Sequence, residues 1–363
     1  MSASWKWPGS RWWRVDLHTH SPASYDFKPE ADRDAKNWAA WVSAAKSAGL
    51  HAVALTDHNT PDGIPYIGTA AAAQGLTVFP GVELTVGGIH LLCILDPKST
   101  RDDIVALLSK LGIEPANFGQ QDASSGKSIV DAIDLATAAG AIVIAAHVNG
   151  PKGLLTVIQG QERLKSLNAS GLIAAELGPL PSDPTGWLDP QGKEDVQDWL
   201  DGTKTGGRKL AQVACSDSHN FAEAGRRFTW VKMTQPDAEG LRLALLDGVG
   251  SLCPATKGDP DDPNKHTDYA IESVTVRQAK YMGRPEALTV AFNPWLNALI
   301  GSRGTGKSTL VDLCRQTLRR ENELGDGETS LRAAFDKRMR VPANRTEEGL
   351  LTDDTVVEVT YRK

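Results

Sequence analysis

Residues 15–20 read VDLHTH, an apolar β-rich run that ends in a His-x-His pair. The same arrangement returns along the chain in ALTDH, GGIHLL, VIAAHV and ACSDSH, which carry His58, His90, His147 and His219. Six of the eight histidines therefore lie at or just after the C-terminal end of a predicted strand. This spacing predicts that these histidines share one site.

Short β-rich runs alternate with Ala- and Leu-rich helical patterns across residues 1–250. We expect strands at residues 14–20, 52–58, 77–85, 89–95, 141–148, 172–177, 212–217 and 228–233. Near-continuous apolar strands alternating with helices predict a parallel α/β fold, either a barrel or an open sheet. In such folds the C-terminal strand ends meet on one face, where the loops build the active site.

Acidic side chains accompany these histidines at Asp16, Asp26, Asp57, Glu83 and Asp217. Because alternate residues of a strand share a face, each His-x-His or Asp-x-His pair can aim two ligands at one point. Imidazole nitrogens combined with carboxylate oxygens suit zinc, manganese or iron. A lone histidine on an apolar strand is usually an ordinary core residue, but six of them with matching carboxylates predict a metal centre.

The ordered motifs HTH, TDH, GVE, a following His, AAH and SDSH resemble those of the PHP (polymerase and histidinol phosphatase) superfamily. The resemblance implies a distorted (β/α)7 barrel in residues 1–253 whose strand ends hold two or three divalent ions that hydrolyse phosphoesters. It implies three metal sites: His18, His20, Glu83 and Asp217 in the first; His90 and His147, with Glu83 as a bridge, in the second; Asp26, His58 and His219 in the third. Relatives often place the carboxylate of Asp26 one residue earlier, where Tyr25 stands. Asp16 and Asp57 are interpreted as residues that orient histidines.

The predicted chemistry follows from charge. A phosphodiester is an anion, and attack on it adds negative charge, which clustered divalent ions neutralise while they acidify a bridging water. A Ser, Cys or Lys nucleophile is then not required. The catalytic candidates are His18, His20, Glu83, His147, Asp217 and Arg226. Arg226 would clamp the substrate phosphate, although an ordinary solvated arginine is an equally good interpretation.

A second motif, GSRGTGKST, occupies residues 301–309 and satisfies the phosphate-loop pattern G-x-x-x-x-G-K-[ST]. It follows the apolar run 296–300, expected to be a strand, and precedes a helical pattern. That setting predicts a binding site for ATP with Mg²⁺, in which the loop amides and the helix N-terminus hold the phosphates. The candidate nucleotide-binding residues are Gly301, Gly304, Gly306, Lys307, Ser308 and Thr309.

The segment around this motif resembles the start of SMC/ABC-type ATPases, and the whole chain resembles TrlF-like fusions of a PHP domain with such an ATPase. We expect a linker at residues 254–268 and a partial ATPase lobe at residues 269–363. This lobe has no recognisable Walker B or signature motif after residue 309. We therefore interpret it as the N-terminal part of an ATPase head, which in a full-length protein would form a homodimer.

Charge is distributed unevenly along the 363-residue chain. The formal net charge is −6, with −8 in residues 1–270 and +2 in residues 271–363. An acidic first part argues against simple electrostatic binding of nucleic acid by that part alone, but suits a site for several cations. The chain has neither an apolar run near the roughly 18 residues of a membrane helix nor a secretory signal. We therefore expect a cytoplasmic protein without membrane association.

The function favoured by the sequence is a metal-dependent phosphoesterase or nuclease that cuts phosphodiesters of nucleic acid or nucleotides. It would be regulated by the SMC-like ATPase and serve DNA repair or anti-phage defence. Two alternatives stay open: a small-molecule phosphomonoesterase of the histidinol-phosphatase type, and a non-catalytic, metal-stabilised module attached to an ATPase.

Overall fold

The structure of the chain is a computed structural model that describes residues 7–178, 193–255, 261–325, 330–344 and 346–362. The chain divides into two compact units: a larger one, Arg11–Pro263, and a smaller one that combines Met1–Ser10 with Asn264–Lys363. Each unit is described by itself. None of the described helices is both long and apolar enough to cross a membrane.

The larger unit is built on a nine-stranded, nearly closed sheet with the strand order β7-β6-β5-β4-β3-β2-β1-β8-β9. The strands are β1 Arg11–Thr19, β2 Ala52–Leu55, β3 Thr77–Val86, β4 Ile89–Ile94, β5 Ile142–Ala145, β6 Leu172–Glu176, β7 Ala211–Val213, β8 Thr229–Met233 and β9 Leu252–Pro254. The expected α/β class and barrel-like sheet are thus present. The lengths differ from prediction mainly at β2, β5 and β7, whose last predicted residues lie in loops.

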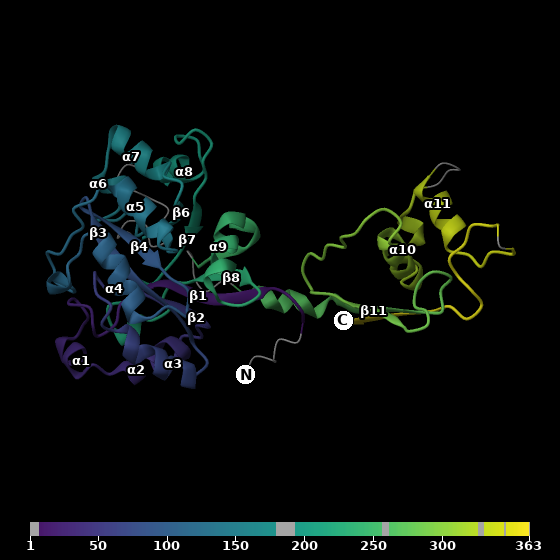
Figure 1. Cartoon of the computed structure of the whole chain (residues 1–363), viewed down its shortest axis with the longest axis horizontal. Coiled ribbons are helices and arrows are strands. Elements are labelled where there is room, and N and C mark those ends of the chain that lie inside the picture. Colours follow the sequence, from purple (N-terminus) through teal and green to yellow (C-terminus); the bar gives the residue numbers. More distant parts are fainter. Residues whose placement is uncertain (1–6, 179–192, 256–260, 326–329, 345, 363) are drawn as a thin grey trace. The chain divides into compact units, whose positions relative to one another are not determined.

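Helices surround this sheet (Figure 1). They are α1 Glu30–Ala35, α2 Trp38–Ser47, α3 Ile64–Ala73, α4 Arg101–Lys110, α5 Ile129–Ala138, α6 Leu154–Val157, α7 Gly160–Leu167, α8 Lys193–Leu200 and α9 Ala238–Asp247. Four of these helices begin with a polar N-cap residue. The side chain of each cap accepts a hydrogen bond from a backbone N–H that has no partner within the first helical turn. These caps are Asn37 of α2, Thr100 of α4, Ser128 of α5 and Asp237 of α9.

Both faces of the sheet are buried, which explains the near-continuous apolar runs in its strands. Ala52 and Ala54 of β2 point into an inner core, whereas Val53 and Leu55 pack against α2 and α3. Strand β4 alternates in the same way between the inner core and an outer core under α4 and α5. The inner core also contacts α9, so this helix covers part of the sheet interior.

The expectation of a parallel sheet is wrong for part of it. Strands β1, β2 and β3 are parallel, as are β5, β6 and β7, but β4 is antiparallel to both neighbours and β8 is antiparallel to β1. The cause at β4 is the two-residue turn Gly87-Gly88, where both residues have positive φ angles of 57° and 82°. Glycine adopts such angles readily, and two of them in a row make a tight hairpin.

Because of this hairpin, the position expected for His90 is wrong. This residue lies near the start of β4 rather than at a C-terminal strand end. Because β4 returns directly along β3, the start of β4 lies beside the end of β3, and Thr85 pairs with His90. The side chain of His90 therefore still reaches the edge where the parallel strands end.

The segment after β7 closes the sheet at this edge. The N–H of Asp217 donates to the His18 carbonyl at 3.0 Å, and the N–H of His20 donates to the Ser218 carbonyl at 3.0 Å. A parallel bridge between Thr19 and Ser218 accompanies these bonds. The HTH and SDSH motifs, about 200 residues apart in the chain, thereby form one edge of the candidate site.

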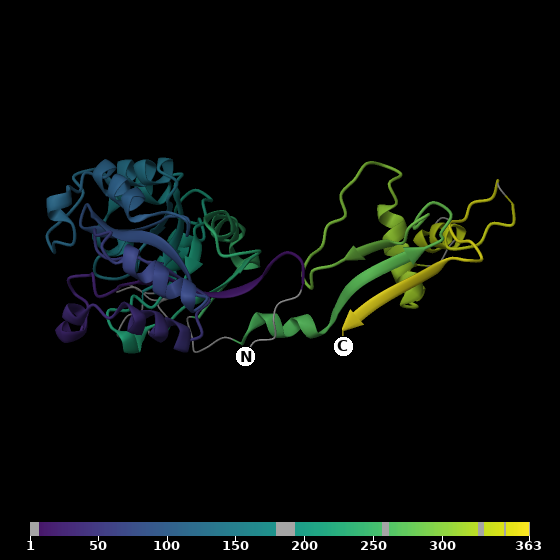
Figure 2. The same cartoon turned by 60° about the horizontal axis from the view of Figure 1, so that its bottom comes forward.

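The smaller unit contains a three-stranded antiparallel sheet of β10 Ala270–Arg277, β11 Leu288–Ala291 and β12 Val356–Arg362, with β10 in the centre. Helices α10 Lys307–Thr317 and α11 Leu331–Arg338 contribute to its apolar core, and Figure 2 shows them beside the sheet. The strand expected at residues 296–300 does not form. Leu296 and Ile300 are exposed there, and no described strand pairs with this run.

Candidate metal centre

The side chain of Glu83 in β3 is 1% exposed and lies at the centre of the histidine cluster. Five imidazole nitrogens lie near its two oxygens. Around Oε2 are His18 Nε2 at 3.2 Å, His20 Nε2 at 3.2 Å and His58 Nδ1 at 3.1 Å; near Oε1 are His90 Nδ1 at 2.6 Å and His147 Nε2 at 3.1 Å. A single buried carboxylate thus connects side chains from four strand ends.

Three of these side chains, His18, His20 and Glu83, have the mutual spacing of ligands around one ion, and Asp217 lies beside the two histidines. The Nε2 atoms of His18 and His20 are 3.2 Å apart, and each lies 3.2 Å from Glu83 Oε2. Asp217 Oδ1 lies 3.4 Å from His18 Nε2 and 3.3 Å from His20 Nε2. Ligand atoms at about 2.0–2.1 Å from a tetrahedral zinc ion are about 3.3–3.4 Å from one another. His18, His20 and Glu83 of the first predicted ligand group therefore match the spacing of ligands around one ion, and Asp217 as their fourth partner stays a prediction.

The hydrogen bonding of Glu83 supports the same interpretation. Its Oε2 atom is buried and accepts no hydrogen bond from the described residues, although three imidazole nitrogens lie within 3.2 Å of it. A buried carboxylate oxygen without a partner is costly. A cation between the oxygen and the imidazole lone pairs would remove this cost, so the donor set fits a divalent ion.

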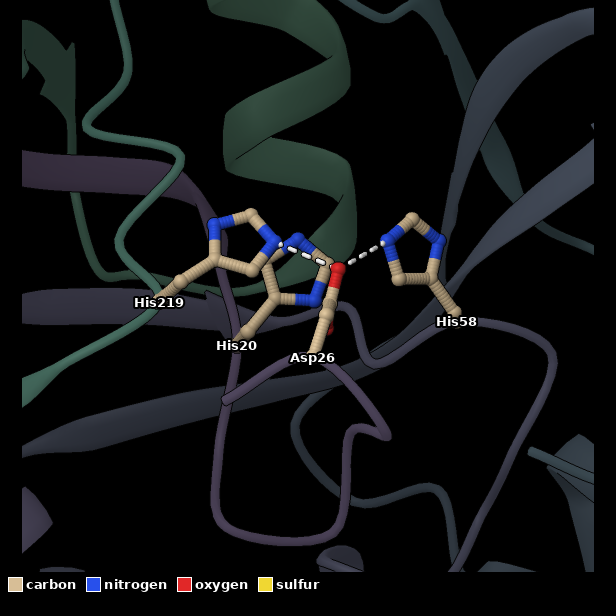
Figure 3. A group of neighbouring side chains, drawn as sticks. All are labelled: His20, Asp26, His58 and His219. Atoms are coloured by element: carbon tan, nitrogen blue, oxygen red, sulfur yellow. Dashed lines mark hydrogen bonds and ion pairs between the residues drawn. The ribbon is translucent and has the colours of Figure 1, made fainter. Parts of the chain in front are cut away.

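A second ligand group surrounds Asp26. Its Oδ2 atom lies 3.1 Å from His58 Nε2 and 2.9 Å from His219 Nε2, and His20 completes the group shown in Figure 3. One ligand atom from each of these four residues lies within 4.8 Å of those of the others. Asp26 provides the acidic group here, while the ring of the preceding Tyr25 lies 5.1 Å from that of His58.

His58 connects the ligand groups. Its Nε2 faces Asp26, and its Nδ1 faces Glu83. Together with Glu83 and His90 it forms a further group whose ligand atoms lie within 4.8 Å of one another. The ring of His147 lies 5.3 Å from that of His90, on the side of Glu83 Oε1. The structure thus brings all nine sequence-predicted ligands into one connected cluster.

Glu176, at the end of β6, is a functional residue that the sequence analysis missed. It is fully buried, and its Oε2 lies 2.8 Å from His18 Nδ1 and accepts the N–H of His147 at 3.0 Å. A proton on His18 Nδ1 leaves the Nε2 lone pair free for the cluster, so Glu176 selects the ligating tautomer. The available signal was a single carboxylate at the end of the apolar run LIAAEL.

Asp16 and Asp57 are buried but do not orient imidazole rings, which corrects the prediction. Asp57 accepts the N–H and the O–H of Ser21 at 2.6 Å each, and Asp16 accepts the N–H of Ser216 at 3.0 Å. Burial raises the pKa of each carboxyl to about 6, against the opposing hydrogen bonds. Both residues fix the backbone of the ligand-bearing segments.

Without a bound cation, the cluster holds protons. Burial disfavours a charged His20, but the neighbouring carboxylates of Asp217 and Glu83 outweigh it and raise its pKa to about 10. The pKa of His18 also lies well above its usual value, because Glu176, Asp217 and Glu83 outweigh burial. The neighbouring imidazoles hold the pKa of Glu83 well below its usual value despite burial. Metal binding must therefore displace protons.

Two of the candidate ligands have left-handed backbone conformations. The φ angle is +25° at His147 and +50° at Asp217. Such angles are strained for residues other than glycine, and strain of this kind concentrates at functional sites. The peptide N–H of Asp217 is held by His18, and that of His147 by Glu176. A Cβ at Gly178 would lie 2.9 Å from the His147 Cβ, so glycine is needed beside this ligand.

Arg226 lies on the loop that follows His219. Its Nε donates to the Ser216 carbonyl at 2.9 Å, and its Nη1 forms an ion pair with Glu223 Oε1 at 2.9 Å. The side chain is partly exposed and already has two protein partners. The predicted role as a phosphate clamp therefore stays a prediction.

The phosphate-loop residues lie in the smaller unit. Helix α10 begins at Lys307, after Gly306 with φ +88°, as the motif requires. Lys307 Nζ donates to the carbonyls of Gly301 and Ser302 at 2.6 Å each. A cavity of about 500 Å³ is lined by Gly304, Gly306, Lys307, Ser308 and Thr309 together with residues of neighbouring segments.

Replacing Glu83 by alanine should lower the metal content by more than one equivalent, because its two oxygens face different groups of histidines. Metal analysis of the purified, metal-loaded variant measures this loss. The exposed Glu239, which pairs with Arg242 on the surface, provides the control Glu239→Ala, for which we expect unchanged metal content. A Glu83→Ala protein with full metal content would contradict a bridging role.

Replacing Glu176 by glutamine should weaken metal binding by about 10- to 100-fold, the usual effect of removing a partner behind a ligand. The shape of the side chain is kept, but the negative charge that holds the His18 Nδ1 proton is lost. Competition with a chelator of known affinity measures the change, with Glu239→Gln as the control. Equal affinities for the two variants would show that Glu176 does not orient His18.

Residues 16–174 match the family model described as PHP domain. No curated protein matches the chain significantly.

Among solved structures, the lesion-specific endonuclease PfuEndoQ from Pyrococcus furiosus is similar at 16% identity and a TM-score of 0.49, covering 72% of this chain and 62% of that protein. A proposed metal-dependent phosphoesterase from Bifidobacterium adolescentis matches at 19% identity and a TM-score of 0.41, covering 65% of this chain and 96% of the other. This chain therefore spans less than two thirds of the length of the endonuclease. By the family match over residues 16–174, the chain contains a PHP domain.

Proposed function

We propose that the metal centre of this chain hydrolyses phosphodiester bonds of nucleic acid. The phosphoester hydrolase class follows from the PHP domain. The observation that carries the proposal is the connected cluster around Glu83, in which nine histidine and carboxylate side chains offer places for two or three divalent ions. Zinc, manganese and iron suit these donors.

The bound ions would supply positive charge for the anionic transition state and a nucleophile made from water. The side chains of the chain itself hold the geometry for this reaction. Glu176 keeps the Nε2 atom of His18 aimed at the cluster, and the Asp57–Ser21 pair fixes the loop that carries Asp26. The cluster is partly open to solvent at His219 and Asp217, so substrate has access there.

A covalent cysteine mechanism has no support in this unit. Cys93 and Cys215 are buried, and burial raises the pKa of the Cys93 thiol to about 12. Burial likewise raises the pKa of Cys215 well above its usual value, and it also raises the pKa of the partly exposed Cys253. A thiol is nucleophilic only as the thiolate, so water is the better nucleophile for this site.

The phosphate loop of the smaller unit is proposed to bind Mg-ATP and to regulate the hydrolase. The loop glycines and the N-terminus of the 11-residue helix α10 provide N–H groups for phosphates. SMC-like heads act on DNA, and this analogy favours nucleic acid over small monoesters as the substrate. Dimerisation through the head and a role in DNA repair or anti-phage defence belong to the same proposal.

Cleavage of nucleic acid is testable directly. With Mn²⁺, the protein should degrade a labelled oligonucleotide, and His147→Ala should lose at least about 100-fold in rate, since removing a ligand costs no less than removing its supporting partner. Gel analysis of the products measures the rates, with Glu239→Gln as the active control. Release of phosphate from small monoesters, without cleavage of any oligonucleotide under any metal, would favour the phosphomonoesterase alternative.

Replacing Lys307 by alanine should abolish binding of a fluorescent ATP analogue, because Lys307 is the lysine of the phosphate-loop motif, which reaches the β- and γ-phosphates. In the absence of ATP, phosphodiester hydrolysis should stay within about twofold of the wild-type rate, because a substitution in this loop leaves the metal ligands in place. Lys337 is an exposed lysine of α11, and the variant Lys337→Ala is the control for loss of a positive charge.

We expect little ATP turnover at the phosphate loop, because residues 310–363 contain no recognisable Walker B or signature motif. Brisk ATP hydrolysis that is lost in Lys307→Ala but kept in Glu83→Ala would contradict this expectation. A loss of ATP hydrolysis only in Glu83→Ala would mean that the metal centre itself cleaves nucleotides.

A further inference from the structure

A pocket of about 560 Å³ adjoins the metal centre in the larger unit. It is formed by the loop after β1, by the segment around α1 and α2, and by the start of α3. The lining side chains that matter for recognition are Tyr25, Arg33, Lys36, Trp38, Tyr66 and Arg101. A volume of this size is within the range of pockets that hold small ligands.

One loop connects this pocket with the metal centre. Asp26 directs its carboxylate to His58 and His219, whereas the preceding Ser24 and Tyr25 line the pocket. The Ser24 hydroxyl donates to Asp26 Oδ1 at 2.7 Å. Because adjacent residues of the same short loop serve both places, a ligand in the pocket lies next to the ions that the cluster would hold.

The pocket contains an exposed aromatic platform. The rings of Trp38 and Tyr66 are stacked, with centroids 5.2 Å apart and planes only 4° from parallel. Trp38 packs against the core beneath α2, whereas Tyr66 is 57% exposed. A tyrosine ring fixed from below by an indole offers a flat surface to solvent, and nucleic-acid bases stack on such rings regardless of their sequence.

Cationic side chains surround this platform. Lys36 is exposed and forms no ion pair among the described residues, and Arg101 is partly exposed and pairs with Asp62 at 3.2 Å. The lining contains three cationic and two acidic side chains. This small excess suits one or two phosphates but not strong non-specific binding, which agrees with the acidic charge of residues 1–270.

The pocket continues beyond the platform. A neighbouring cavity of about 390 Å³ shares Pro65 and Arg101 with it and extends to Thr100 at the start of α4. A ligand longer than a single nucleotide can therefore follow the surface from the metal centre past Tyr66 to Arg101. This shape favours a polymer as the substrate.

We infer that this pocket is a nucleotide subsite of the hydrolase. It holds the nucleotide next to the scissile phosphate, with the base stacked on Tyr66 and the phosphate near Lys36 and Arg101. This inference rests on the proposed function, because it names how the same metal centre would select a nucleic-acid strand.

The test compares Tyr66→Ala and Tyr66→Phe with the wild-type protein on two substrates. One is a labelled single-stranded oligonucleotide, and the other is bis(4-nitrophenyl) phosphate, a small diester with no nucleobase. Stacking of one base contributes about 1–3 kcal/mol, so Tyr66→Ala should lower kcat/KM for the oligonucleotide by about 5- to 150-fold. Its kcat/KM for the small diester and its metal content should stay unchanged, and Tyr66→Phe should retain the wild-type values on both substrates.

Two results would overturn the subsite while leaving the proposed function in place. In one, Tyr66→Ala cleaves the oligonucleotide as fast as the wild-type protein does. In the other, Tyr66→Ala loses activity equally on both substrates, since the residue would then act on the fold or on the metal centre. A wild-type protein that hydrolyses the small diester but no oligonucleotide would overturn the nucleic-acid function itself, and the subsite with it.

Discussion

The carboxylate of Glu83 is buried among five imidazoles, and this arrangement constrains the rest of the larger unit. Its two oxygens face histidines that arrive from β1, from the loop after β2, from β4 and from the loop after β5. The other segments must end, and the antiparallel β4 must begin, at the same edge of the sheet for the cluster to form. The closing bonds between the segment after β7 and the end of β1 bring Asp217 to the same place.

The surrounding fold holds this cluster at a cost in backbone strain and polar burial. Left-handed conformations at His147 and Asp217 are unfavourable in isolation, and the hydrogen bonds that their N–H groups donate to Glu176 and to the His18 carbonyl maintain them. The partnerless Oε2 atom of Glu83 adds to this cost. Bound divalent ions would offset both, because metal binding in the folded state contributes to its stability.

The sequence predicted which side chains gather in the cluster better than it predicted the path of the strands. Histidines at strand ends are informative because a ligand must be both positioned and exposed to the site, and His18, His20 and Glu83 share one group as expected. Strand direction is not encoded in hydrophobic periodicity, so the antiparallel β4 was missed, although Gly87-Gly88 is a hairpin signal. Glu176 was missed because its role depends on a contact with His18, 158 residues away in the chain.

The same dependence on distant pairing explains why the strand expected in the smaller unit does not form. Residues 296–300 are apolar enough for a strand, but a strand needs a hydrogen-bonding neighbour, and the described residues provide none. The helix after the phosphate loop forms as predicted because its signals are local: a glycine at position 306 and, directly after it, an apolar spacing that buries Leu310 and Leu313 on one face. Features that depend on local chemistry were therefore predictable, and those that depend on distant pairing were not.

The most direct test of a metal centre joined by Glu83 is a crystal structure of the Mn²⁺- or Zn²⁺-loaded protein, with anomalous scattering measured at the absorption edge of the metal. The account predicts an anomalous peak about 2.0–2.2 Å from His18 Nε2, His20 Nε2, Glu83 Oε2 and Asp217 Oδ1. It also predicts at least one further peak on the other side of Glu83. A loaded crystal with no peak among these four atoms, or with a single peak that does not contact Glu83, would contradict the account.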